Sequence, residues 1–375
     1  MTSIERREAR FQRRKARREE IRKRRNEQYG NFDKVYTYEH LYHAYLMCRR
    51  NVRWKSSTQK YIANATLNVY DTYMKLQEGT FRSRGFYEFD LFERGKPRHI
   101  RSVDMYERVI QRCTCDYSLI PMLQPSFIHD NGATMKGKGY SFAVKRFNRH
   151  LQWHIRKHGS KGYILLFDFS SYFDSIPHEL LMKTLNEAYE DKKTLKLIKH
   201  FIDMFGDKGI GLGSQVSQVL ALAAANELDH FIKEELHIKC YGRYMDDGYL
   251  MHESREYLKE CMRRIEQKCI EMGLKLSVKK THIYSISKDF MWLKIRYRVT
   301  GTGHIVKRVW RKSVVRMRRK LKKFKRMLDK GVVTAFDIRQ SVQSWKSHIR
   351  GLAVYHTMKR LDELIFNLFG TEVIA

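Results

Sequence analysis

Several features are scarce in this sequence, and each scarcity excludes a class of protein. The six cysteines show no paired Cys-x-x-Cys spacing, which argues against a zinc ribbon and a dense disulfide framework. The longest uncharged stretch, residues 209–226, contains Gly, Ser and Gln and is too polar to span a membrane. The arginine-rich N-terminus has no apolar core segment, so it is no secretory signal. These absences predict a cytoplasmic protein without a membrane partner.

Acidic residues are also scarce relative to basic ones. The 375 residues include 74 Lys or Arg and 41 Asp or Glu, and the formal net charge is +33. Such a charge destabilises a compact chain through self-repulsion, so it predicts a polyanionic partner, with nucleic acid favoured over an anionic membrane surface. With 42% hydrophobic and 13% aromatic residues the chain can form a core. Its length predicts two or three subdomains.

One concentration of charge lies at the N-terminus. Residues 1–25 hold 12 Lys or Arg against four Asp or Glu. Thr2 and Glu5 have capping-box spacing, and no Gly or Pro precedes Gly30, which predicts a helical arm over residues 1–29. Its apolar residues are too sparse to bury a face, so a solvated arm and an arm that folds on phosphate both fit. The candidate nucleic-acid contacts here are Arg13, Arg14 and Arg17.

A second concentration lies at residues 311–330, with 11 Lys or Arg against one Asp. Apolar residues recur there at offsets of three and four, which predicts a helix with one buried stripe formed by Val314, Met317, Leu321, Phe324 and Leu328. The other faces of this helix are basic and suit a nucleic-acid backbone, although a solvated surface helix has the same pattern. The candidate nucleic-acid contacts are Arg316, Arg319, Lys320 and Lys323.

Two hydrophobic segments end in carboxylates. The apolar run 163–167 reads as a buried strand that presents Asp168 at its end, and Pro177 then starts a helix. In the segment 241–250, an Asp-Gly pair between hydrophobic residues predicts a hairpin with Asp246 and Asp247 at its tip. Such carboxylates are costly unless cations lie there, and two Mg²⁺ ions, or Mn²⁺ in their place, would serve nucleotide addition.

These residues resemble motifs of a known family. Asp168-Phe-Ser-Ser-Tyr-Phe-Asp followed by Tyr244-Met-Asp-Asp resembles the two carboxylate motifs of reverse transcriptases. Further segments resemble the family's other motifs in the expected order: Lys96-Pro-Arg98 of the fingers, the Gly- and Lys-rich 132–139, the glycine loop 209–218, the lysine-containing 273–281, and the primer-grip segment 290–293. The resemblance covers about residues 90 to 350. Lys294 stands where a glycine is usual.

The resemblance implies an α+β right-hand polymerase fold. After the arm at residues 1–29, it implies fingers at 30–160, a ferredoxin-like palm with part of the fingers at 161–304, and an α-helical thumb at 305–375, with no RNase H domain. The implied enzyme is an RNA-directed DNA polymerase, a nucleotidyltransferase that uses two Mg²⁺ ions. Its implied partners are a template or noncoding RNA, deoxynucleoside triphosphates and the cDNA product, together with a small accessory protein or a second copy of the chain.

The resemblance also implies roles for single residues. Asp168, Asp246 and Asp247 are the implied catalytic carboxylates and metal ligands, with the backbone carbonyl of Phe169 as a further ligand. Lys280 is the implied acid that protonates pyrophosphate. Lys96 and Arg98 are implied to bind the triphosphate, and Phe173 to exclude a ribose 2′-hydroxyl. The remaining implied nucleotide-pocket residues are Gly213, Ser217 and Gln218.

The biological role stays open at this point. Leu212-Gly213 followed by Ser217-Gln218 resembles the loop of reverse transcriptases from diversity-generating retroelements. Antiphage defence enzymes that work with a noncoding RNA share the same core. A non-catalytic RNA-binding scaffold with a polymerase fold, or untemplated or protein-primed DNA synthesis, remains the alternative function.

Overall fold

The computed structural model describes residues 2–93, 96–371 and 373 and divides into two compact units. The first comprises Met1–Arg146, Phe167–Gly248 and Cys261–Lys280, and the second Phe147–Leu166, Tyr249–Glu260 and Thr281–Ala375. The four-part division expected from the sequence stays a prediction. In the described ranges, no helix combines the length and the apolar character needed to cross a membrane.

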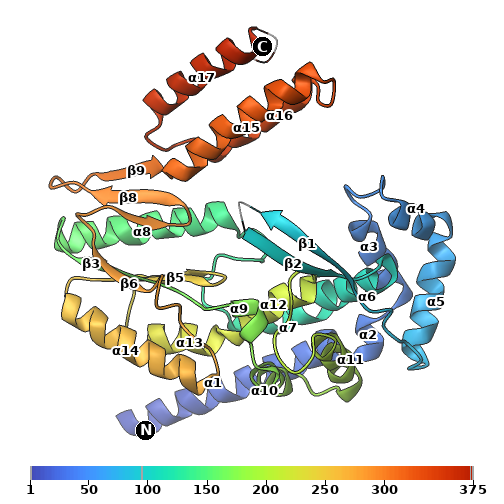
Figure 1. Cartoon of the computed structure of the whole chain (residues 1–375). Helices are drawn as coiled ribbons and strands as arrows, with labels where there is room; N and C mark the ends of the chain where they lie inside the picture. Colours follow the sequence, from blue (N-terminus) through green and yellow to red (C-terminus); the bar gives the residue numbers. More distant parts are fainter. Residues whose placement is uncertain (1, 94–95, 372, 374–375) are drawn as a thin grey trace. The chain divides into compact units, whose positions relative to one another are not determined.

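The N-terminal arm is a helix, as its sequence predicts. Helix α1 spans Ser3–Arg25 (Figure 1). The capping box between Thr2 and Glu5 is present at its start. No residue of α1 is buried. The first anchored residue is Asn26, whose side chain donates to the carbonyl of Ala188 at 3.0 Å and accepts from the amide of Glu190 at 3.0 Å. The arm is therefore attached to the first unit at its C-terminal end.

Helices dominate the first unit. Its N-terminal part contains α2 Phe32–Val35, α3 Tyr38–Cys48, α4 Ser56–Ala63, α5 Ala65–Gln77, α6 Met105–Thr114 and α7 Ile120–Leu123, with the antiparallel hairpin β1 Tyr87–Glu93 and β2 Lys96–Ser102 between α5 and α6. Helix α6 packs against α3 and lies in the core, where Val109, Ile110 and Cys113 are fully buried. Asp104 caps it by accepting from the amide of Glu107 at 2.9 Å, which fixes where the chain leaves the hairpin.

A second group of helices follows the first carboxylate motif: α9 Tyr172–Ser175, α10 His178–Ala188, α11 Lys192–Asp203, α12 Gln215–Ala224 and α13 Asn226–His230. Helix α10 begins one residue later than predicted, because Pro177 has the extended ψ of 137° typical of an N-cap. Helix α12 is nearly all buried, consistent with its small and aliphatic residues.

The central sheet has four strands in the order β4-β5-β3-β6, and the division between the units passes through β3 and β5. These strands are β3 Tyr163–Asp168, β4 Tyr241–Tyr244, β5 Asp247–His252 and β6 His282–Ser285. Strand β3 confirms the predicted buried strand, since every residue after Tyr163 is buried. Two long helices, α8 Tyr140–His158 and α14 Arg255–Glu271, complete this part of the chain.

The second carboxylate motif forms a hairpin, but its turn lies earlier than the Asp-Gly pair indicated. Strand β4 ends at Tyr244 and β5 begins at Asp247, so Met245 and Asp246 form the turn. Met245 adopts a left-handed φ of 55°. Gly248 lies inside β5 and is needed for packing, because a Cβ there would lie 2.2 Å from the Phe167 ring.

The second unit contains a three-stranded sheet and a helical bundle. The sheet consists of β7 Phe290–Trp292, β8 Ile295–Val299 and β9 Ile305–Val309, and the bundle of α15 Arg311–Asp329, α16 Ala335–His348 and α17 Tyr355–Phe369. The predicted stripe of α15 faces the bundle core, where Met317 and Leu321 are buried against Ile338 and Leu361. The inner face of the sheet packs on α8, and the rings of Phe147 and Trp292 stack there at 4.6 Å.

We expect the substitution Gly248→Ala to destabilise the first unit by about 1–3 kcal/mol, because the Phe167 ring must move to admit the new methyl group. Urea unfolding measures this change. Gly301→Ala is the control, since a Cβ at Gly301 meets nothing within 4 Å. Equal unfolding midpoints for the two variants would contradict the packing role of Gly248.

Candidate active site

The three predicted catalytic carboxylates come together at the ends of the two central strands of the four-stranded sheet. Asp168 is the last residue of β3, Asp246 lies in the turn after β4, and Asp247 is the first residue of β5. Strands β3 and β5 are neighbours in the sheet, which brings both motifs side by side. Asp168 is only 4% exposed, whereas Asp246 and Asp247 are half-buried.

Burial and the charges of neighbouring carboxylates raise the pKa of Asp246 and of Asp247. Burial is the largest cause that raises the pKa of Asp246, and the charge of Asp168 raises it further. Burial together with the charges of Asp246 and Asp168 raises the pKa of Asp247 to about 7. The charges of Lys280 and Arg98 oppose the rise at Asp246. Positive charge beside these carboxylates therefore favours their ionised forms.

Lys280 supplies one positive charge directly. Its Nζ donates to both carboxylate oxygens of Asp168, at 2.7 and 2.6 Å. The segment that carries Lys280 is held beside β3 by two backbone hydrogen bonds, from Ser170 to Lys275 at 2.8 Å and from Ser277 to Asp168 at 2.7 Å. Burial alone would lower the pKa of Lys280, but the hydrogen bonds and charges of the three carboxylates raise it overall. The ammonium group therefore holds its proton firmly.

The donor set is chemically suited to a hard divalent cation. Within the described residues, no three His, Cys, Asp or Glu side chains form a group arranged to hold a metal ion. The carboxylate oxygens of Asp168 and Asp246 are nevertheless the ligand type that Mg²⁺ prefers, and the charge of Asp168 raises the cost of ionising Asp246. A cation between them would remove that cost. Metal binding by Asp168, Phe169, Asp246 and Asp247 stays a prediction.

The glycine loop leads into α12 beside the β1–β2 hairpin. The amide of Arg101 donates to the carbonyl of Leu212 at 3.0 Å, and a Cβ at Gly213 would lie 2.5 Å from the carbonyl oxygen of Arg101. Gly213, with φ 121°, therefore permits an approach that no other residue could make. Gln218 is exposed, but Ser217 is buried and its hydroxyl donates to the carbonyl of Ile210.

Two further predicted nucleotide contacts lie near the carboxylates. Arg98 is exposed on β2, and its charge acts on Asp246. Phe173 is half-buried, its ring meets that of Tyr172 edge to face at 5.9 Å, and its carbonyl accepts from the amide of Ile210 at 2.9 Å. The backbone of Lys96 belongs to β2, while its side chain lies outside the described part of the structure.

The predicted nucleic-acid contacts lie on the surfaces of two helices. On α1, Arg13, Arg14 and Arg17 are all exposed. On α15, Arg319 and Lys323 are exposed, Arg316 lies over the Trp310 ring at 4.9 Å, and Lys320 donates to the Ser341 hydroxyl at 2.6 Å. Helix α1 belongs to the first unit and α15 to the second.

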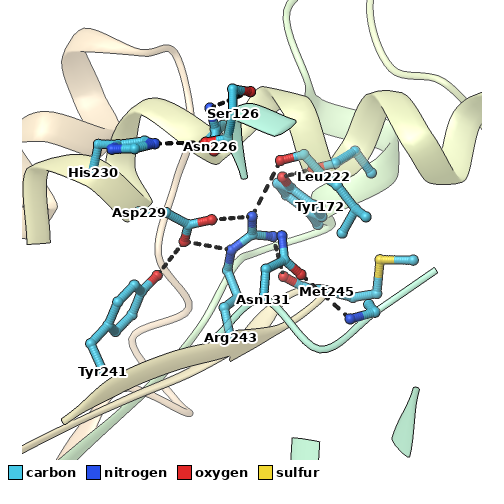
Figure 2. A network of polar contacts seen from close by, with 12 residues as sticks. Ser126, Asn131, Tyr172, Leu222, Asn226, Asp229, His230, Tyr241, Arg243 and Met245 are labelled. Carbon is cyan, nitrogen blue, oxygen red and sulfur yellow. Dashed lines mark hydrogen bonds and ion pairs between the residues drawn. The ribbon is translucent and has the colours of Figure 1, made fainter. Parts of the chain in front are cut away.

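Sequence reasoning missed a buried ion pair behind the catalytic turn (Figure 2). The side chains of Arg243 on β4 and Asp229 on α13 are both 0% exposed. The guanidinium donates to both oxygens of Asp229, at 2.8 and 2.6 Å, and to the carbonyl of Met245 at 2.8 Å. The available signal was an arginine inside an aromatic strand segment, where a charge is buried only if it is paired.

Comparisons with known proteins agree with these motifs. The family model described as "Reverse transcriptase (RNA-dependent DNA polymerase)" matches residues 90–328. No curated protein matches the chain.

Solved structures that match include apo telomerase from Candida tropicalis, at 13% identity and TM-score 0.46 over 80% of this chain and 63% of that one. A form of that telomerase truncated from its C-terminal domain matches at 12% identity and TM-score 0.44, over 65% and 60%. Telomerase from Candida albicans with a fragment of telomeric RNA matches at 10% identity and TM-score 0.45, over 80% and 60%. The chain thus spans about 60% of the telomerase chains.

We expect Asp247→Asn to stabilise the protein at pH 8 in a buffer with a chelator. Because the pKa of Asp247 is raised to about 7, its contribution to stability is complete below the unfolded pKa of about 4 and is lost as the pH rises through 7. The variant should therefore melt about 2–4 °C above wild type at pH 8 and at the same temperature at pH 4.

Asp337→Asn provides a control of opposite sign. Backbone and side-chain hydrogen bonds from Thr334 lower the pKa of Asp337, so this variant should lose stability at pH 8. A lower melting temperature for Asp247→Asn at pH 8 would contradict the repulsion among the three carboxylates.

Proposed function

The chain belongs to the reverse transcriptase family, and we propose that it is an RNA-directed DNA polymerase that extends a primer with deoxynucleotides on an RNA template. The right-hand polymerase fold follows from the family. The observation that carries the proposal is the cluster of Asp168, Asp246, Asp247 and Lys280 at the ends of β3 and β5, beside the glycine loop and the fingers hairpin. The chemistry of nucleotide addition needs carboxylates and a proton donor at one place.

In this proposal Asp168 and Asp246 hold two Mg²⁺ ions, helped by Asp247 and the carbonyl of Phe169. When bound, the ions lower the pKa of the primer 3′-hydroxyl and neutralise charge on the phosphates. The hydroxyl oxygen forms a bond to the α-phosphorus, its proton passes to solvent, and the bond from the α-phosphorus to pyrophosphate breaks. Lys280 leaves Asp168 and gives a proton from Nζ to the departing pyrophosphate.

The chain's other residues select and orient the nucleotide in this proposal. Arg98 and Lys96 bind the triphosphate through fixed positive charge. The ring of Phe173 fills the space of a ribose 2′-hydroxyl, so deoxynucleotides are preferred. Gly213 and Gln218 line the pocket at the N-terminal end of α12, whereas the hydroxyl of Ser217 acts inside the loop, on the carbonyl of Ile210.

The proposed partner is a template RNA, whose phosphates bind basic side chains of α1 and of α15. The loop residues Leu212, Gly213, Ser217 and Gln218 favour a retroelement of the diversity-generating type over an antiphage system with a noncoding RNA. The genes beside this one separate the two: a template and variable repeat pair belongs to the first, and a noncoding RNA within a defence cluster to the second.

The double substitution Asp246→Ala, Asp247→Ala should reduce primer extension on RNA to below about one-thousandth of wild type. RNA binding should be unchanged or slightly tighter, because two negative charges are removed from a basic protein. Primer extension with Mg²⁺ and fluorescence anisotropy with the same RNA measure the two effects.

Three results would contradict the proposal. Incorporation by the double variant would remove these carboxylates from the chemistry. A wild type that binds RNA without incorporating nucleotides would indicate a scaffold. Product sequences unrelated to the RNA would indicate untemplated synthesis.

Deleting residues 1–25 should weaken RNA binding and reduce its salt dependence while leaving thermal unfolding unchanged, because α1 has no buried residue. Replacing Arg13, Arg14 and Arg17 together with Ala should lower the slope of log K against log salt concentration by about 2–3. Binding titrations from about 50 to about 300 mM salt measure the slope, because phosphate contacts weaken over this range. An unchanged slope in both variants would exclude the arm from the RNA surface.

A further inference from the structure

Both catalytic segments are hydrogen-bonded to the same helix. The hydroxyl of Tyr172, four residues after Asp168, donates to the carbonyl of Ala221 at 2.5 Å. Arg243, three residues before Asp246, donates from Nη2 to the carbonyl of Leu222 at 3.2 Å. Figure 2 shows both side chains reaching this part of α12. Consecutive carbonyls of one buried helix therefore receive a donor from each carboxylate motif.

The Tyr172 contact acts on Asp168 through a short rigid path. Tyr172 is 4% exposed, and its ring stacks on that of Phe169 with centroids 4.6 Å apart and planes 17° apart. Phe169 directly follows Asp168 and is itself 3% exposed. Ser171 between them has a left-handed φ of 47°, a conformation that a non-glycine residue keeps only where its surroundings impose it. The hydroxyl bond to Ala221 is one such constraint.

The Arg243 contact acts on Asp246 through the turn. Its Nη1 donates to the carbonyl of Met245, the residue with φ 55° that precedes Asp246. Asp229 accepts from Nε and Nη2 and from the hydroxyl of Tyr241, which orients the guanidinium fork. The guanidinium makes four hydrogen bonds, to Asp229, to the turn and to α12, and an ammonium group has only three donors.

Stability alone gives no reason for this arrangement. A buried ion pair contributes little net stability, since the cost of removing two charges from water offsets their attraction, and apolar residues of similar volume often do as well. The left-handed φ of Met245 adds a further cost. The donors of Arg243 beyond those that pair with Asp229 are directed at the catalytic turn and at α12.

We propose that Tyr172 and Arg243 are positioning residues that fix the separation of Asp168 and Asp246 by tying both motifs to consecutive carbonyls of α12. The inference rests on the proposed polymerase function. Neither residue touches the nucleotide or the reacting atoms in this assignment. Each acts by holding a carboxylate where a shared cation is bound, so loss of either contact should weaken metal binding and lower kcat without weakening RNA binding.

Tyr172→Phe is the decisive variant, and Tyr36→Phe is its control. Tyr36 is also fully buried, and its hydroxyl makes one hydrogen bond, of 2.9 Å to Thr114, remote from the carboxylates. Both variants lose one buried hydroxyl and its hydrogen bond, so their melting temperatures should fall by similar amounts. We expect Tyr172→Phe to lower kcat about tenfold and to weaken Mn²⁺ binding, measured by electron paramagnetic resonance, about threefold or more. Tyr36→Phe should change both by less than about twofold.

Arg243→Lys tests the other contact and the link between the two. This variant keeps the positive charge beside Asp229 but lacks the fork, so kcat should fall about 100-fold, with RNA affinity and the KM for deoxynucleotides within about threefold of wild type. Because both residues act through α12, the double variant should lose less than the product of the single losses.

The inference is overturned if Tyr172→Phe and Tyr36→Phe have the same kcat and Mn²⁺ affinity, or if the two single losses simply multiply. Should Arg243→Lys fail to fold, the tyrosine pair alone decides. Failure of the proposed function looks different: a wild type without DNA synthesis contradicts that function, while Mn²⁺ binding still separates Tyr172→Phe from Tyr36→Phe.

Discussion

Mutual repulsion among Asp168, Asp246 and Asp247 is the constraint on which the rest of the site depends. Burial and the charge of Asp168 raise the pKa of Asp246, and burial with the charges of Asp246 and Asp168 raises the pKa of Asp247. Lys280 compensates part of this repulsion through both oxygens of Asp168. The surrounding chain must therefore hold groups together that repel one another, which explains why so many backbone and buried side-chain contacts converge on these two motifs.

Helix α12 and its neighbours provide that restraint. The helix begins at a loop that is hydrogen-bonded to strand β2, and near its C-terminal end it accepts a donor from each carboxylate motif. The glycine loop and both carboxylate motifs are thus connected to one buried helix. The buried pair of Arg243 and Asp229 adds a second restraint from α13, at the turn where the backbone is strained.

The excess positive charge is divided between different environments. Helix α1 carries its arginines without burying any residue, so its charge has no structural cost beyond self-repulsion. Helix α15 buries an apolar stripe in the bundle core and carries its charge on the remaining faces. Lys280 and Arg98 act directly on the carboxylates. Part of the net positive charge therefore lies on the exposed faces of two helices, and another part acts on the carboxylates.

Local patterns in the sequence determined the arm helix, strand β3, the stripe of α15 and the order of the motifs, because each depends on neighbours within a few residues. The Asp-Gly pair predicted the hairpin turn at the wrong position. Gly248 is required by its close packing against the ring of Phe167 and not by the turn. Tertiary structure alone decided that Lys280 meets Asp168 from 112 residues away, and that Arg243 pairs with Asp229 and reaches Leu222. Such contacts produce no repeating pattern in the sequence, because they pair charged groups on elements that come together only when the chain folds.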